Sequence, residues 1–202
     1  MKQLQKGFSL VELLVVVAII GVLAGVGIVG YQSYTDSAKS RVAIANYNSV
    51  KRFIETELTL LNNQIQTTSG AINAYDTNCA GSTTKFDNTA NNAANNLGAF
   101  LQGIVCYFAT DGYGNVFKNP YATDGASQVV YNGSATTKGT INIRLITAAE
   151  VTAGTAAGAT ISAGQADAAT VTADGDFIVT YYGTAGTEST TGDEKGKVFT
   201  LQ

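Results

Sequence analysis

Lys6-Gly7-Phe8-Ser9-Leu10-Val11-Glu12-Leu13-Leu14 opens an almost unbroken apolar run that continues to Val29. The run from Phe8 to Val29 has 22 residues, and as an α-helix it spans roughly 33 Å, enough to cross the hydrocarbon core of a bilayer. One charged residue, Glu12, interrupts it. A charge costs about 2.5–3.5 kcal/mol at the bilayer centre and less near a helix end. We therefore expect Glu12 to have a partner, and we expect the helix itself to supply none.

The start of the chain combines three features: a short basic leader from Met1 to Gly7, a Gly7-Phe8 junction, and a glutamate at the fifth position after that junction. This combination resembles the N-terminal segment of the type IV pilin family over roughly the first 30 residues. The resemblance implies that a prepilin peptidase cuts between Gly7 and Phe8, on the cytoplasmic side of the apolar run. It also implies N-methylation of Phe8, an inner-membrane precursor, inner-membrane assembly machinery, and an extracellular pilus filament on the bacterial cell surface.

Two other interpretations start from the same residues. Lys2 and Lys6 before an apolar run also describe a secretory signal peptide, and Val22-Leu23-Ala24 would then serve as the signal-peptidase site. The second alternative is a plain membrane anchor. Neither explains why the charge of Glu12 is tolerated, so the pilin resemblance is preferred.

Glu12 is the residue on which we expect filament assembly to depend. In a bundle of identical helices its carboxylate could meet the Phe8 ammonium of a neighbouring copy. That pairing would neutralise both charges and fix the axial register between neighbours. The alternative is that Glu12 only lies at the headgroup boundary of the membrane.

Composition excludes several classes of function. Lys2 and Lys6 are two of the 12 basic residues, so 10 remain against 15 acidic ones without the leader, a net charge of about −5. This is the wrong sign for a nucleic-acid-binding surface, and no direct nucleic-acid partner is expected. Histidine is absent, which excludes catalytic triads that use histidine, zinc sites with histidine ligands and haem held by histidine. With no nucleophile–base pair visible, we predict no catalytic residue and no enzyme.

The two cysteines, Cys79 and Cys106, lie well beyond the membrane segment. If the basic leader stays in the cytoplasm, they face the oxidising side of the membrane. A bridge between them would close a loop of 28 residues, worth about 3.5 kcal/mol in the chain-entropy model. We predict a disulfide, with free thiols as the alternative.

No cofactor is predicted, and calcium is a weak candidate only. Asp111, Asn115 and Asp124 around one loop, or Asp174 and Asp176 around another, offer oxygen ligands. Neither spacing matches an EF-hand, and Asp and Asn are the ordinary residues of turns. The prediction therefore names no metal site, and Asp111, Asn115 and Asp124 are weak calcium candidates only.

Beyond Val29 the helical pattern continues and becomes amphipathic. Tyr31 and Tyr34 are placed like an aromatic belt, and the helix is predicted to end near Asn62-Asn63. Apolar residues recur at mostly three- and four-residue intervals, at Ala38, Val42, Ala45, Val50, Phe53, Ile54, Leu58 and Leu61. The glycines between Gly21 and Gly30 either loosen the helix or allow close packing against another helix.

The remainder of the chain predicts a sheet after a variable connection from Thr67 to Asn96. We expect a short helix around Asn91 to Gln102 and a buried apolar run from Ile104 to Phe108. Strands are predicted at Val129–Tyr131, Thr140–Ile146, Phe177–Tyr182 and Lys197–Leu201. Asn132-Gly133-Ser134 is formally a glycosylation sequon, but Asn-Gly is also the commonest hairpin turn, which is preferred. The low-complexity stretch between Thr147 and Ala173 predicts exposed strand-and-turn units.

The predicted fold is α+β, pilin-like: a long N-terminal helix whose second half packs on a C-terminal antiparallel sheet of about four strands. The predicted parts are a cleaved leader (1–7), a membrane and filament-core helix (8–29), its amphipathic continuation (30–62) and a globular head (63–202). The predicted function is structural: copies of the chain polymerise through their apolar helices into a type IV pilus, a fimbrium of the kind used in adhesion and motility. The alternatives are a pseudopilin of type II protein secretion, acting as a periplasmic piston, and a minor or adhesive pilin.

Overall fold

The computed structural model describes the N-terminal helix and most of the sheet-containing part of the chain. The described residues are 7–62, 97–108, 117–122, 129–131, 137–146, 148–160, 175–190 and 192–201. They fall into two units, Met1–Lys39 and Ser40–Gln202.

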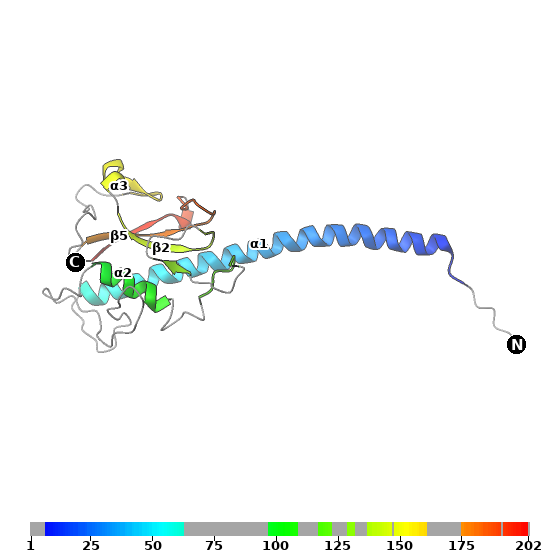
Figure 1. Ribbon diagram of the computed structural model, residues 1–202, viewed down its shortest axis with the longest axis horizontal. Coiled ribbons are helices and arrows are strands. Elements are labelled where there is room, and N and C mark those ends of the chain that lie inside the picture. Colours follow the sequence, from blue (N-terminus) through cyan, green and yellow to red (C-terminus); the bar gives the residue numbers. More distant parts are fainter. Residues whose placement is uncertain are drawn as a thin grey trace. The chain divides into compact units, whose positions relative to one another are not determined.

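The helix α1 (Leu10–Asn62, 53 residues) is the dominant element (blue to cyan in Figure 1). Its first half contains runs such as Val15-Val16-Val17, and β-branched residues lower intrinsic helix propensity. In an apolar environment, however, a helix satisfies every backbone N–H and C=O within one segment. The backbone stays α-helical from Gly21 to Gly30, so the glycines do not interrupt the helix in this structure. The helix extends at least to Asn62, the last described residue of this segment, so its predicted end near Asn62-Asn63 stays a prediction.

Within the second unit, α1 buries one stripe of side chains. Ala43, Tyr47, Val50 and Ile54 are fully buried, and Leu58 is 7% exposed. Their three- and four-residue spacing places them on one face of the helix. The amphipathic prediction is therefore right, but its stripe was placed wrongly at the start, because Val42 is 50% exposed and Ala45 is also exposed. The buried face begins at Ala43 and Tyr47 instead.

Helix α2 (Leu97–Cys106) adds a second apolar surface to the same core. Phe100 and Leu101 are buried. The apolar run predicted to be buried, Ile104 to Phe108, is buried except for Tyr107, which is partly buried. The prediction of a short helix here is confirmed, but the observed helix ends at Cys106, four residues later than the predicted end at Gln102. The predicted start at Asn91 lies outside the described residues.

The sheet has four strands in the order β1 (Val130–Tyr131), β2 (Ile141–Leu145), β5 (Gly175–Tyr181) and β6 (Lys197–Leu201). All four coincide with predicted strands to within two residues, which confirms the α+β class. The β2–β5 and β5–β6 pairs are antiparallel.

The sheet is mixed, however, because β1 pairs with β2 in parallel, with Val130 opposite Ile141. The prediction of a wholly antiparallel sheet was wrong at this edge. A hairpin at Asn132-Gly133 would have reversed the chain directly into an antiparallel partner. Instead the connection returns the chain to the same end of the sheet. A strand of only two residues advances about 7 Å, so the nine residues from 132 to 140 can make that return.

One face of the sheet carries the main core. Strand alternation points Ile143, Phe177, Val179 and Phe199 to the same side, where they pack with the buried residues of α1 and α2. The ring of Phe177 stacks on Phe199 at 5.5 Å between centroids and meets the edge of Phe100 at 5.9 Å. Burying each such side chain stabilises the fold by about 1.5–3 kcal/mol.

The other face of the sheet is covered by a smaller layer. Helix α3 (Ala148–Ala153) and the hairpin of β3 (Thr155–Ala156) and β4 (Ala159–Thr160) follow β2 (Figure 1, yellow). Ile146, directly after β2, and Ile178 on β5 are fully buried in a second cluster with Ala159. The prediction of exposed strand-and-turn units was right about the hairpin and missed α3. The alanines of α3 favour helix, whereas the low-complexity stretch as a whole suggested strands and turns.

The hairpin turn uses two residues with positive φ, Ala157 (44°) and Gly158 (77°). This combination defines the type I′ turn that suits two-residue hairpins. A Cβ on Gly158 would overlap the backbone of Thr190, so glycine is required there for space as well as for φ. The Ala157 carbonyl accepts the Gly196 N–H at 2.8 Å, which ties the turn to the segment before β6.

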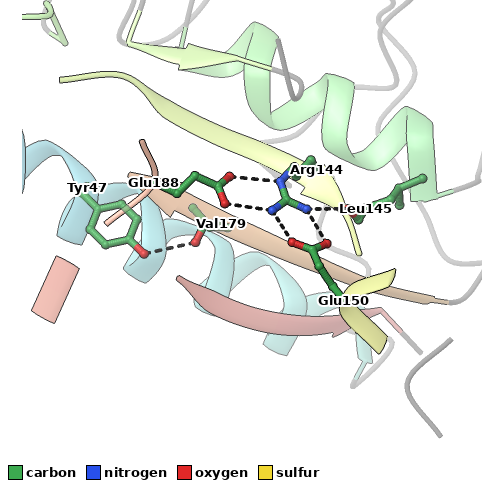
Figure 2. A network of polar contacts seen from close by, with 6 residues as sticks. All are labelled: Tyr47, Arg144, Leu145, Glu150, Val179 and Glu188. Atoms are coloured by element: carbon green, nitrogen blue, oxygen red, sulfur yellow. Dashed lines mark hydrogen bonds and ion pairs between the residues drawn. The ribbon is translucent and has the colours of Figure 1, made fainter. Parts of the chain in front are cut away.

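A polar network reinforces this layer (Figure 2). The Arg144 guanidinium on β2 donates to both oxygens of Glu150 on α3, at 2.8 and 2.7 Å, and to both oxygens of Glu188, at 3.1 and 3.0 Å. It also donates to the Leu145 carbonyl at 3.3 Å. The hydrogen bond to Glu150, opposed by burial and reinforced by Glu188, raises the pKa of Arg144 above its usual value. Such paired, bidentate contacts fix the geometry more strongly than single bonds.

Tyr47 joins α1 to the sheet from within the core. Its hydroxyl donates to the carbonyl oxygens of Lys195 at 2.7 Å and Val179 at 3.1 Å. Burial, with a smaller contribution from the negative charge of Glu188, raises the pKa of Tyr47 far above 10. The neutral hydroxyl is therefore the form that the folded state requires.

Candidate functional site

The predicted cleavage junction of the pilin resemblance lies just before α1, and Glu12 lies in the first turn of the helix. Gly7, Phe8 and Ser9 have no helical or strand backbone and are exposed, with Phe8 87% exposed. Peptidases need an accessible, irregular segment. The predicted cut between Gly7 and Phe8 would therefore fall on a peptide bond of this kind, with Phe8 and Ser9 between it and the first helical residue, Leu10.

Ser9 and Glu12 cap the helix reciprocally. The Ser9 N–H donates to Glu12 Oε2 at 2.9 Å, and the Val11 N–H donates to Ser9 Oγ at 3.3 Å. The Leu13 N–H then makes the first bond to the Ser9 carbonyl, at 3.2 Å. Ser-x-x-Glu with this pattern is a capping box, which satisfies two backbone donors that a helix start leaves free.

This geometry corrects the expectation that the helix supplies no partner for Glu12. Its carboxylate accepts a backbone N–H at the start of its own helix, where a negative charge also interacts favourably with the helix dipole. Sequence reasoning did not identify Ser9, although the signal was present, because Ser-x-x-Glu before an apolar run is the sequence signature of a capping box.

Every large apolar side chain between Phe8 and Val29 is exposed, by at least 48%. A Cβ on Gly21, Gly25, Gly27 or Gly30 would meet open space. Within the described residues, α1 is also the one helix long and apolar enough to cross a membrane. A continuous apolar surface of this size is far larger than a soluble monomer leaves uncovered, so the segment is built to be covered by lipid or by other helices.

The other predicted site residues are placed only in part. Cys106 is fully buried and disulfide-bonded, but Cys79 lies outside the described residues, so their pairing stays a prediction. Asp111, Asn115, Asp124, Asp174 and the sequon at Asn132 also lie outside them. Among the residues that the structure describes, no group of three or more Asp, Glu, Cys or His side chains could hold a metal ion.

Asp176 is the described member of the second calcium hypothesis. It is buried, and its Oδ1 accepts a hydrogen bond from the Thr200 hydroxyl across the β5–β6 pair. The contact ties two strands together and gives Asp176 a structural role in the sheet.

Comparison with known proteins places the N-terminal segment. Residues 2–28 match the family described as Prokaryotic N-terminal methylation motif. In this segment the chain is similar to type IV pilins. Among pilins, it is 45% identical over 56 residues to the type IV major fimbrial protein FimA of Dichelobacter nodosus, covering 28% of this chain and 36% of FimA.

Two further pilins give the same result. The type IV major pilin protein PilE1 of Neisseria gonorrhoeae is 52% identical over 44 residues, covering 22% of this chain and 27% of that pilin. A fimbrial protein of Pseudomonas aeruginosa is 43% identical over 54 residues, covering 27% of this chain and 35% of that protein. The matches thus span about a third of the length of these curated pilins, and no solved structure matches the chain. These relatives are structural pilin subunits, in agreement with the prediction of no enzyme.

Proposed function

We propose that this chain is a structural subunit of a type IV pilus. A precursor, anchored in the inner membrane by residues 8–29, is cut between Gly7 and Phe8 by a prepilin peptidase. The Phe8 amine is methylated, and the inner-membrane assembly machinery adds the subunit to a surface filament of identical copies. Residues 30–62 continue the helix and residues 63–202 form the head. The observation that carries this proposal is a capped helix start bearing Glu12, between an exposed cleavage segment and a wholly exposed apolar helix.

Membrane anchoring and filament assembly place different demands on this helix. Burying its apolar side chains in lipid stabilises the anchored precursor by roughly 25 cal/mol per Å² of apolar surface. Moving the helix from lipid into a bundle of similar helices gains little further hydrophobic free energy, because lipid tails are as apolar as leucine. Packing and polar contacts between helices must therefore drive docking.

Glu12 supplies the polar contact in this proposal. Its carboxylate would pair with the Phe8 ammonium of a neighbouring subunit, which removes an uncompensated charge from both helices at once. Because each subunit offers one carboxylate and one new N-terminus, the pairing repeats along a filament and defines one axial register. The open Cβ positions at the four glycines from Gly21 to Gly30 would let neighbouring helices approach closely.

A type II secretion pseudopilin would share the same N-terminal chemistry. The names of the relatives, major fimbrial and pilin proteins, favour a surface pilus. Immunogold electron microscopy of cells expressing the full chain tests the difference, with shearing to release surface filaments. Labelled filaments outside the cell support the pilus, whereas label confined to the periplasm in cells that process the chain would show a pseudopilin. A Gly7→Val control, which should block cutting, should abolish filaments in either case.

A further inference from the structure

The capping box places the carboxylate that assembly is proposed to use. Glu12 is the third residue of α1, and its side chain turns back to the Ser9 N–H at 2.9 Å. An exposed glutamate without such a contact samples many rotamers, and holding one of them costs conformational entropy at docking. A capped Glu12 has already lost that freedom before a neighbour arrives.

We propose that Ser9 is a positioning residue for Glu12 in filament assembly, which rests on the proposed function. Ser9 fixes the helix start in the conformation that aims its own N–H at Glu12 Oε2. The carboxylate then points toward the N-terminal end of the helix, with Oε1 left to accept the ammonium of a neighbouring Phe8. Both contacts can exist together, since a carboxylate has about four lone-pair positions on its two oxygens.

Observed hydrogen bonds and exposures support each part of this arrangement. Ser9 Oγ accepts the Val11 N–H, so the hydroxyl holds the first turn in place. Among the described residues, the hydrogen bond that the Glu12 side chain accepts uses Oε2. No described side chain covers the helix start, because Phe8, Ser9, Leu10 and Val11 are all exposed. A second subunit can therefore reach Oε1 without displacing the cap.

The size of the effect follows from capping energetics. Replacing a serine N-cap by alanine weakens a helix start by a factor of about five in equilibrium constant, while threonine keeps the capping hydroxyl. Ser9→Ala should therefore lower the fraction of subunits with a positioned Glu12 about fivefold. Ser9→Thr is the matched control, because it alters the same position and retains the cap.

Two measurements on the full chain separate positioning from a merely structural role. The first is the hydrogen-exchange rate of the residue 9 amide in the precursor in detergent micelles, followed by nuclear magnetic resonance and corrected for intrinsic side-chain effects. The second is the amount of cut, unassembled subunit in the membrane at which filaments first appear, measured by inducible expression. Counting only cut subunit prevents slower processing from imitating weaker docking.

The proposal predicts that Ser9→Ala raises both the exchange rate and the filament threshold about fivefold, and that Ser9→Thr restores both. Equal exchange in the alanine and threonine variants would overturn it even if alanine blocked cutting, because exchange is measured before cutting. A faster exchange with an unchanged threshold would also overturn it. If the wild-type chain is cut but forms no filaments, the proposed function has failed rather than the role of Ser9.

Discussion

Glu12 allows its two roles, capping and pairing, to be separated by two substitutions. Glu12→Gln keeps a side-chain oxygen that can accept the Ser9 N–H, now bonded at 2.9 Å, but removes the charge. Glutamine is the other residue that a capping box accepts at this position. Glu12→Val removes both the charge and the acceptor, and it makes the helix a better membrane anchor because a charge in lipid is costly.

The magnitudes differ enough to decide between the roles. Losing the cap costs about 0.5–2 kcal/mol. Leaving the Phe8 ammonium of a neighbour unpaired inside the bundle costs about 3–5 kcal/mol per contact, a factor of roughly 10² to 10³ or more in docking. If pairing matters most, both variants should fail to form filaments, and valine should be only slightly worse than glutamine.

The assay counts filaments by electron microscopy beside an immunoblot of cut subunit in the membrane. We expect both variants to be made, inserted and cut between Gly7 and Phe8, and to accumulate in the membrane instead of in filaments. Normal filaments from Glu12→Gln with none from Glu12→Val would show that only the cap is needed. Normal filaments from both would refute the pairing and register argument.

The second unit, Ser40–Gln202, offers three further predictions, measured by thermal or chemical unfolding of the detergent-solubilised chain. Gly158→Ala should lower the free energy of unfolding by about 2–4 kcal/mol, through strain at positive φ and overlap of the new Cβ with Thr190. Gly186→Ala is the control: at φ 78° in open space, it should cost only about 1 kcal/mol. Equal losses of stability in the two variants would rule out the overlap with Thr190. The free energy of unfolding should stay level up to about pH 10 and fall above it, because the raised pKa of Tyr47 means that the unfolded state loses its proton first. Tyr47→Phe should be less stable at pH 7, but its free energy of unfolding should fall less steeply above pH 10. An equally steep fall in the variant and the wild type would contradict this. Cys106→Ser should lower stability by about 3.5 kcal/mol if the bridge to Cys79 forms without slowing cutting of the leader, and two alkylatable thiols in the native protein would disprove the bridge.

Periodicity predicted the elements whose pattern is local. The three- and four-residue spacing up to Leu58 correctly gave a helix with one buried face, and alternation gave strands at Ile141 and Phe177. The start of the buried stripe was misplaced by one or two residues, since Val42, Ala43 and Ala45 are all apolar. Only packing against the sheet decides which of them faces the core.

Elements that depend on distant contacts were not predictable in this way. The parallel β1–β2 pair depends on where the connection returns the chain, and Asn132-Gly133 carries the same turn signal in either case. The Arg144 network joins Glu150, six residues away, with Glu188, 44 residues away. No spacing rule links such residues. Ser9 is different, because its capping signature was present in the sequence and was overlooked.

The most direct test of the account is the N-terminus of the chain recovered from filaments. Intact and peptide mass spectrometry should show a chain that begins at Phe8 with an N-methylated amine, since the apolar helix must remain whole for assembly and Glu12 must be the fifth residue of the cut chain. A chain beginning at Gly25 would indicate a secretory signal peptide, and an uncut chain beginning at Met1 would indicate a plain anchor. Either result would contradict the assignment as a pilus subunit.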